Sequence, residues 1–305
     1  ELPFKLFSPE HDGYLDDDGK LFLFSGLGQS RRKAEFIADL AKRVVPGSKI
    51  AAIAALPTPI AAPLIAKGHT ESGKERSQQL IMGSEAAAKL WATIAASQLR
   101  HADPTRVESA WYRIKAEGSN WSFGDWVTLA RKCAEGNPMC RSLTSGLDEA
   151  LARCVELRNA ELHNRAGVDL LDKLELAVTA LVREWGKAFN DRLQVVVSAR
   201  NKQSGVALRT RAFSGDRMHG EPITWEQPHG SAASRLREGH VIWGDPQSYL
   251  LLDPWIISRA TKSGEIGLWA IYRVNKSSCR YDRLWVPPAE EEGELTIPGP
   301  FRIAQ

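Results

Sequence analysis

Two adjacent stretches decide the fold: TSGLDEALARCVELRNAELHN at residues 144–164 and VDLLDKLELAVTALVREWGKAF at residues 168–189. In both, apolar residues recur three or four positions apart, which gives an α-helix one apolar face. Ala166-Gly167 separates them, so we predict two long amphipathic helices joined by a short turn. The first apolar face comprises Leu147, Ala150, Leu151, Cys154, Val155, Leu157 and Leu162, and the second comprises Leu170, Leu171, Leu174, Val178, Leu181 and Trp185.

Helical periodicity continues toward the N-terminus. Asp103-Pro104 predicts the start of one helix, with proline at its first position. Ser122 or Asn120 can cap another helix, and Gly136-Asn137-Pro138 predicts its end. We therefore expect a helical bundle over residues 49–190. A long helix before residue 103 would bury Leu80, Ala87, Trp91, Ile94 and Leu99.

The composition changes after Asn190. Runs rich in Val, Ile, Tyr and Trp, separated by Gly, Pro, Asn and Asp, are typical of strands. We expect a small antiparallel β-domain over residues 191–305, with an acidic tail at 290–294. The fold class is therefore α+β, a mainly α-helical bundle followed by antiparallel strands. The expected strands are 195–197, 206–213, 241–243, 249–252, 266–272 and 281–285.

The N-terminal 48 residues predict a hairpin and a helix. Short apolar runs at 3–7 and 21–24 are separated by Asp16-Asp17-Asp18-Gly19, which is typical of a turn. A basic helical segment at 31–44 follows them. The chain begins with Glu1 rather than Met, which fits a start inside a longer precursor or after a removed tag.

Composition narrows the class of protein. The chain has 305 residues and a net charge of +3, which is too weak a bias to prove a nucleic-acid partner. Its four cysteines form no CxxC pair, so we expect no disulfide framework, no metal site and a reducing, cytoplasmic environment. The most apolar stretch, 49–66, contains three prolines, so we expect no membrane span.

One polar group stands out at the end of the 144–164 segment. Asn159 and His163 are four residues apart and share a helix face, and Arg158 immediately precedes Asn159. A guanidinium can hold a phosphate, and an imidazole can transfer protons near neutral pH. With RNA, the 2′-hydroxyl supplies the nucleophile, so no metal or cofactor is needed. One histidine cannot act as base and acid together, whereas a two-fold dimer would supply two.

This segment resembles the Arg-x(4–6)-His motif of HEPN domains, often written Leu-Arg-Asn-x-x-x-His at a helix end. The resemblance extends at pattern level from about residue 50 to 285, through Leu56-Pro57-Thr58-Pro59-Ile60-Ala61 and Phe123-Gly124-Asp125-Trp126. It implies a metal-independent endoribonuclease, active as a homodimer, in bacterial antiviral defence or a toxin–antitoxin system. Arg158 and His163 match the family's catalytic pair, and Asn159 matches its polar companion. The alternative is a non-catalytic HEPN scaffold or regulatory subunit that binds RNA or protein in a defence or signalling complex.

A second Arg-x4-His match occurs at Arg235 and His240. It passes through Gly239 into an expected strand, so its geometry does not suit the bundle. His219, His229 and His240 lie among glycines and prolines, which favours a surface loop over a metal site.

Basic residues suggest where RNA would bind. Arg209 and Arg211 are two apart on an expected strand and therefore share a face. A groove for an RNA backbone and a solvated sheet face are the two interpretations. Tryptophans at strand spacing could stack on bases, but the core is the favoured place for them. The candidate RNA-binding residues are Arg165, Arg200, Lys202, Arg209 and Arg211.

Overall fold

A computed structural model describes residues 7–8, 13–15, 21–23, 49–69, 72–114, 119–135, 138–162, 170–189, 192–215, 217–286 and 293–299. The chain divides into two compact units, Glu1–Ala54 and Ala55–Gln305. The first unit contains an antiparallel sheet in the order β1-β2-β3, followed by the short helix α2. The expected hairpin thus has a strand inside its predicted connection, and the expected 31–44 helix lies outside the described residues. The bounds are β1 (Phe7–Ser8), β2 (Gly13–Leu15), β3 (Leu21–Leu23) and α2 (Lys49–Ala54).

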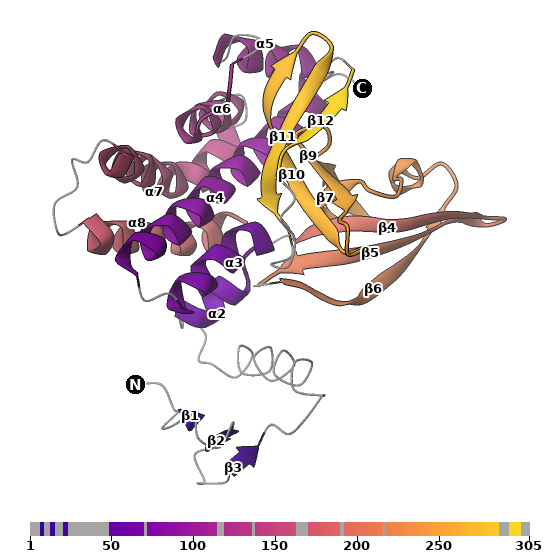
Figure 1. The fold of residues 1–305 in the computed structure, drawn as a ribbon. Helices are drawn as coiled ribbons and strands as arrows, with labels where there is room; N and C mark the ends of the chain where they lie inside the picture. Colours follow the sequence, from indigo (N-terminus) through magenta and orange to yellow (C-terminus); the bar gives the residue numbers. More distant parts are fainter. Residues whose placement is uncertain are drawn as a thin grey trace. The chain divides into compact units, whose positions relative to one another are not determined.

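The second unit begins with helices that surround α4 (Figure 1). Every residue of α4 from Ala86 to Ser97 is buried, because both helices and strands pack against it. Small side chains in this stretch let its neighbours approach closely. The helices are α3 (Thr58–Ala66), the 3₁₀ turn η2 (Lys67–His69), α4 (Gly73–Ala102), α5 (Pro104–Ile114), α6 (Phe123–Glu135), α7 (Pro138–Leu162) and α8 (Leu170–Ala188). Among the described residues, no helix combines the length and apolar character that crossing a bilayer requires.

The predicted helices are present, with one difference at a boundary. We expected Gly136-Asn137-Pro138 to end one helix and the next to start near Thr144. The structure instead ends α6 at Glu135 and begins α7 at Pro138. Proline suits the first turn of a helix, where its missing N–H has no intrahelical partner. A Pro after a turn residue can therefore mark a start as well as an end.

The rest of the second unit forms two antiparallel sheets, which confirms the α+β class. One has the strand order β6-β5-β4-β7-β8 and is called here the β4 sheet; the other has the order β12-β11-β10-β9 and is called the β10 sheet. The strands are β4 (Leu193–Lys202), β5 (Gly205–Ser214), β6 (Arg217–Pro228), β7 (Val241–Asp245), β8 (Ser248–Leu251), β9 (Ile256–Ala260), β10 (Ile266–Asn275), β11 (Ser278–Trp285) and β12 (Leu295–Pro298).

Three of these strands were not expected from the sequence: β6, β9 and β12. The expectation of a loop around His219 was wrong, because this residue lies in β6. β6 contains Pro222 and Pro228, but it is an edge strand, where a missing N–H costs no ladder hydrogen bond. β12 pairs with β11, so residues Leu295–Pro298, directly after the acidic segment, belong to the β10 sheet.

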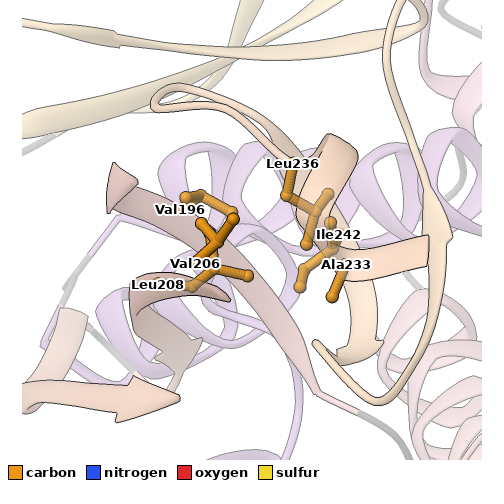
Figure 2. Close-up of a cluster of buried hydrophobic side chains, with 6 residues drawn as sticks. All are labelled: Val196, Val206, Leu208, Ala233, Leu236 and Ile242. Atoms are coloured by element: carbon orange, nitrogen blue, oxygen red, sulfur yellow. The ribbon is translucent and has the colours of Figure 1, made fainter. Parts of the chain in front are cut away.

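An apolar cluster covers one face of the β4 sheet (Figure 2). Side chains from β4, β5 and β7 point toward the segment around the 3₁₀ turn η3 (Ala232–Arg235). Trp225 packs against the edge of this cluster, and its indole N–H donates to Thr210 Oγ1 at 2.9 Å. The cluster comprises Val196, Val206, Leu208, Ala233, Leu236 and Ile242.

Four tryptophans of the strand region are core residues, as the sequence favoured. Trp255 and Trp269 are fully buried, and Trp243 and Trp285 are at most 9% exposed. Rings so enclosed cannot stack on nucleic-acid bases without unfolding their surroundings. Any RNA contact of the β-region must therefore use other side chains.

Polar contacts fasten the strands to the helices. Ser97 on α4 donates its hydroxyl to the carbonyl oxygen of Leu251 at 2.9 Å. The backbone N–H of Trp121 donates to Tyr272 O on β10 at 2.7 Å. Pro57 and Ser214 form an isolated antiparallel bridge. The helices and both sheets thus share one compact unit.

We predict that Gly83→Ala on α4 destabilises the protein, although Ala is ordinarily the better helix residue. A Cβ at position 83 would lie 2.9 Å from Leu64 Cδ2 and 3.2 Å from Ile60 O on α3. Leu64 is 3% exposed and has no free space to move into. We expect a loss of about 1–3 kcal/mol in the free energy of unfolding, measured by chemical denaturation.

The matched control is Gly186→Ala on α8, where no atom lies within 4 Å of the new Cβ. It should gain about 0.5–1 kcal/mol from helix propensity and lost unfolded-state entropy. Stabilisation by both substitutions would contradict the close approach of α3 and α4.

Candidate functional site

The sequence-predicted catalytic group lies at the C-terminal end of α7. Arg158 is half-buried in its last turns, and its Nη1 donates to Asn159 Oδ1 at 3.3 Å. The described residues offer Arg158 no ion pair. Leu157, beside it, is 5% exposed and faces the core, as its position in the apolar pattern requires. His163 and Arg165 follow the last residue of α7 and lie outside the described residues.

The helices around this group are held by the expected apolar faces. α7 packs on α4, α6 and α8. The side chain of Glu184, near the end of α8, lies over the backbone of Gly146, near the start of α7. The two helices therefore run antiparallel, and Arg158 lies at the end where α8 begins. Arg158 therefore lies at the C-terminal end of α7, four residues before its last residue, Leu162.

A cysteine one turn before Arg158 is not a candidate nucleophile. Cys154 is completely buried in the core. Burial raises the pKa of its thiol to about 12, although a hydrogen bond with Ser84 acts in the opposite direction. The reactive form of cysteine is the thiolate, which is therefore scarce at neutral pH. The reactive groups that α7 can offer are therefore the polar side chains at its C-terminal end, Arg158 and Asn159.

The predicted RNA-binding residues of the β-region come together on one face of the β4 sheet. Directly opposed residues of antiparallel strands share a face, and Ser198 opposes Arg209 while Arg200 opposes Ala207. Lys202 opposes Gly205 at the turn. Arg211 is two residues from Arg209 on β5 and therefore lies on this same face, opposite Val195. We call Arg200, Lys202, Arg209 and Arg211 the basic strand face.

The basic strand face is largely open to solvent. Arg200, Lys202 and Arg209 are exposed, and Arg211 is half-buried. Lys202 forms a salt bridge with Glu226 on the neighbouring strand β6. The opposite face of these strands carries the apolar cluster of Figure 2. Strand alternation therefore places these cations on the face opposite the cluster, and Val195, which opposes Arg211, is buried at one end of the same face as the cations.

The histidine of the second Arg-x4-His match, His240, lies beside the start of a strand. His240 immediately precedes β7 and is half-buried, and its Nδ1 accepts the backbone N–H of Arg237 at 3.2 Å. Burial lowers the pKa of His240, although the charge of Asp253 opposes this. Burial likewise raises the pKa of Asp253, against the charges of His240 and Arg100. This histidine belongs to the β-region and not to the bundle.

Arg100 joins this charged group to α4. It donates to the carbonyl oxygens of Asp253 at 2.8 Å and Leu251 at 2.9 Å. Its guanidinium carbon lies 4.9 Å from the centroid of the Trp255 ring. Such a contact is worth about 0.5–2 kcal/mol, more where water is excluded. Sequence reasoning missed this group, because no local pattern connects residues 100, 240 and 253.

Possible metal ligands are scattered over the part of the chain that the structure describes. There, no group of three or more His, Cys, Asp or Glu side chains is placed to hold a metal ion. The side chains of Cys133, Cys154 and Cys279 are buried.

Comparison with known proteins adds no relative. No protein-family model, no curated protein and no solved structure matches this chain. The function must therefore be argued from the residues themselves.

We predict that His240→Asn weakens the loss of stability on acidification between pH 7 and pH 5. Since burial lowers the pKa of His240 in the folded state, the unfolded state binds its proton more readily. Acid then favours unfolding, and stability rises with pH across this window. The measurement is the denaturation midpoint as a function of pH. Equal pH dependence in the variant and the wild type would refute the burial of His240, with His101→Asn on α4 as the exposed control.

Proposed function

We propose that this protein is a metal-independent endoribonuclease that cleaves RNA at a homodimer interface formed by the helical bundle. The observation that carries the proposal is the environment of Arg158. It is a half-buried cation whose hydrogen bond within the described residues goes to an amide, Asn159, and not to a carboxylate. A guanidinium held in this way keeps its positive charge available for a phosphate. In the sequence, His163 follows Arg158 by five residues and comes directly after Leu162, the last residue of α7.

The chemistry requires no group beyond the protein and the RNA. His163 removes the proton of the 2′-hydroxyl, and the 2′-oxygen attacks the adjacent phosphorus. The bond from phosphorus to the 5′-oxygen breaks, and the partner subunit's His163 returns a proton to that oxygen. Arg158 neutralises the charge that develops on the phosphate, and Asn159 orients the guanidinium. The products are a 2′,3′-cyclic phosphate and a 5′-hydroxyl.

The basic strand face supports RNA binding by the same protein. Its cations lie at the alternating positions of two neighbouring strands, so they form a compact positive surface. The buried tryptophans leave base stacking to other residues, and contacts to the phosphate backbone suit these side chains best. Binding of this kind is independent of RNA sequence and falls with salt.

The alternative is a non-catalytic subunit of a defence or signalling complex that binds RNA or protein. The basic strand face favours this possibility in its own right, since it lies on β4 and β5 and not on α7. The two functions differ in one respect: the alternative retains binding and lacks cleavage.

We predict that Arg158→Ala and His163→Ala each lower RNA cleavage in EDTA by about 10²–10⁴-fold, the range for a lost general acid or base or a lost charge stabiliser. The measurement is cleavage of a labelled single-stranded RNA, with identification of the cyclic phosphate end. Arg153→Ala is the matched control, because Arg153 is exposed on the same helix and pairs with Glu156 at 2.7 Å.

Three outcomes would overturn the nuclease proposal. Activity that disappears in the chelator would require a metal. Activity that survives both substitutions would lie elsewhere in the chain or in a contaminant. RNA binding without cleavage by the wild type would favour the scaffold.

We predict that the triple variant Arg200→Gln, Lys202→Gln, Arg209→Gln loses most of its RNA affinity at low salt. Removing three phosphate contacts should lower the slope of log K against log salt by roughly two, at about 0.7 per contact with a single strand. Fluorescence anisotropy with a labelled RNA measures this slope. Arg259→Gln with Lys262→Gln, exposed cations of the β10 sheet and its turn, is the control. Equal losses in both variants would contradict a localised RNA surface.

A further inference from the structure

A cavity lies where the helices meet the β10 sheet. Its volume is about 180 Å³, and its walls come from α3, α4 and β11. Pro59 and Pro63 line it from α3, Glu85 and Lys89 from α4, and Asp282 and Arg283 from β11, among other residues. Neither the proposed catalytic group nor the basic strand face contributes to it.

The central feature of the cavity is a buried lysine. The Lys89 side chain is 7% exposed, with Nζ 3.0 Å from Glu85 Oε1 and 4.0 Å from Asp282 Oδ2. The first distance allows a hydrogen bond and the second is too long for one. An ammonium group has three N–H donors, and an ammonium removed from water needs partners for them. Lys89 therefore retains capacity for an acceptor within the cavity.

The charges around the cavity define what would fit. Glu85 and Asp282 are negative, Lys89 and Arg283 are positive, and the ionised side chains of the lining sum to zero. An anion alone would meet the two carboxylates, and a cation alone would meet the two basic groups. A molecule that carries both charges can satisfy both pairs at once. The remaining walls are apolar, including Pro59 and Pro63.

The size of the cavity restricts the ligand further. Its volume of about 180 Å³ corresponds to about six water molecules at about 30 Å³ each, and lies below the range of drug-sized pockets. We propose that this cavity binds a small zwitterion, a free amino acid with an apolar side chain. The carboxylate of the ligand would accept from Lys89 and Arg283, its ammonium would donate to Asp282 and Glu85, and its side chain would contact the prolines. This proposal does not depend on the nuclease.

Binding would couple the helices to the β10 sheet. Lys89 belongs to α4 and Asp282 to β11, and the ligand would contact both. A ligand that binds only the folded state stabilises it by RT ln(1 + c/Kd), where c is the free ligand concentration, so the effect grows with ligand concentration. The amino acid should therefore raise the thermal midpoint of the whole second unit.

The test uses the full chain and three probes at equal concentration: L-leucine, isoamylamine and 4-methylpentanoate. The last two are L-leucine without its carboxylate and without its ammonium. Isothermal titration calorimetry should show saturable binding of L-leucine, at least tenfold tighter than either analogue, and L-leucine should raise Tm. No saturable binding of L-leucine, L-valine or L-methionine would overturn the proposal. Equal binding of an analogue that carries one charge would also overturn it.

Variants locate the site. Asp282→Asn and Arg283→Gln, both at half-exposed or exposed positions of β11, should fold and should each weaken L-leucine binding at least tenfold. Lys262→Gln, on the turn before β10, is the control and should leave binding unchanged. Binding that persists in both β11 variants would place the amino acid elsewhere and overturn this site.

Discussion

The burial of α4 is the constraint on which the rest of the second unit depends. From Ala86 to Ser97 every residue of this helix is buried, so a polar group in it is costly unless it is paired within the protein, and among the described residues the indole N–H of Trp91 has no hydrogen-bond partner. Thr93 donates to the carbonyl oxygen of Lys89 at 2.7 Å, and Ser84 donates to that of Leu80 at 2.7 Å. The backbone of α4 thus supplies hydrogen-bond acceptors for some of its own buried side chains. The surrounding helices and strands supply partners for others.

The contacts that α4 cannot make internally attach the two sheets to it. Ser97 and Arg100 reach the carbonyl oxygens of Leu251 and Asp253, beside the β4 sheet, and Lys89 lies near Asp282 of the β10 sheet. Polar groups buried in a low-dielectric interior are costly unless paired, so these contacts fix how the strands lie on the bundle. The cavity beside Lys89 arises at one of these junctions, where side chains of three elements meet and leave space.

The proposed catalytic group and the proposed RNA-binding surface lie on different elements of the second unit. The end of α7 offers a guanidinium and, in sequence, an imidazole, while β4 and β5 offer a cluster of cations. A net charge of +3 over 305 residues does not reveal this cluster, because acidic residues elsewhere offset it. What matters for a phosphate backbone is the local density of charge, which depends on strand register and not on composition.

The sequence by itself determined the helices, the α+β class and the burial of the strand tryptophans, because apolar periodicity and side-chain size report directly on what must leave water. It suggested Arg158, Asn159 and His163, and the structure describes the first two side by side. Tertiary structure alone decided that Arg200 shares a face with Arg209, since this depends on the register of β4 against β5, in which Lys202 opposes Gly205 across a two-residue turn. It alone brought Lys89 to Asp282 and Arg100 to Asp253. Residues so distant in sequence meet through packing of whole elements, and local periodicity contains no information about that packing.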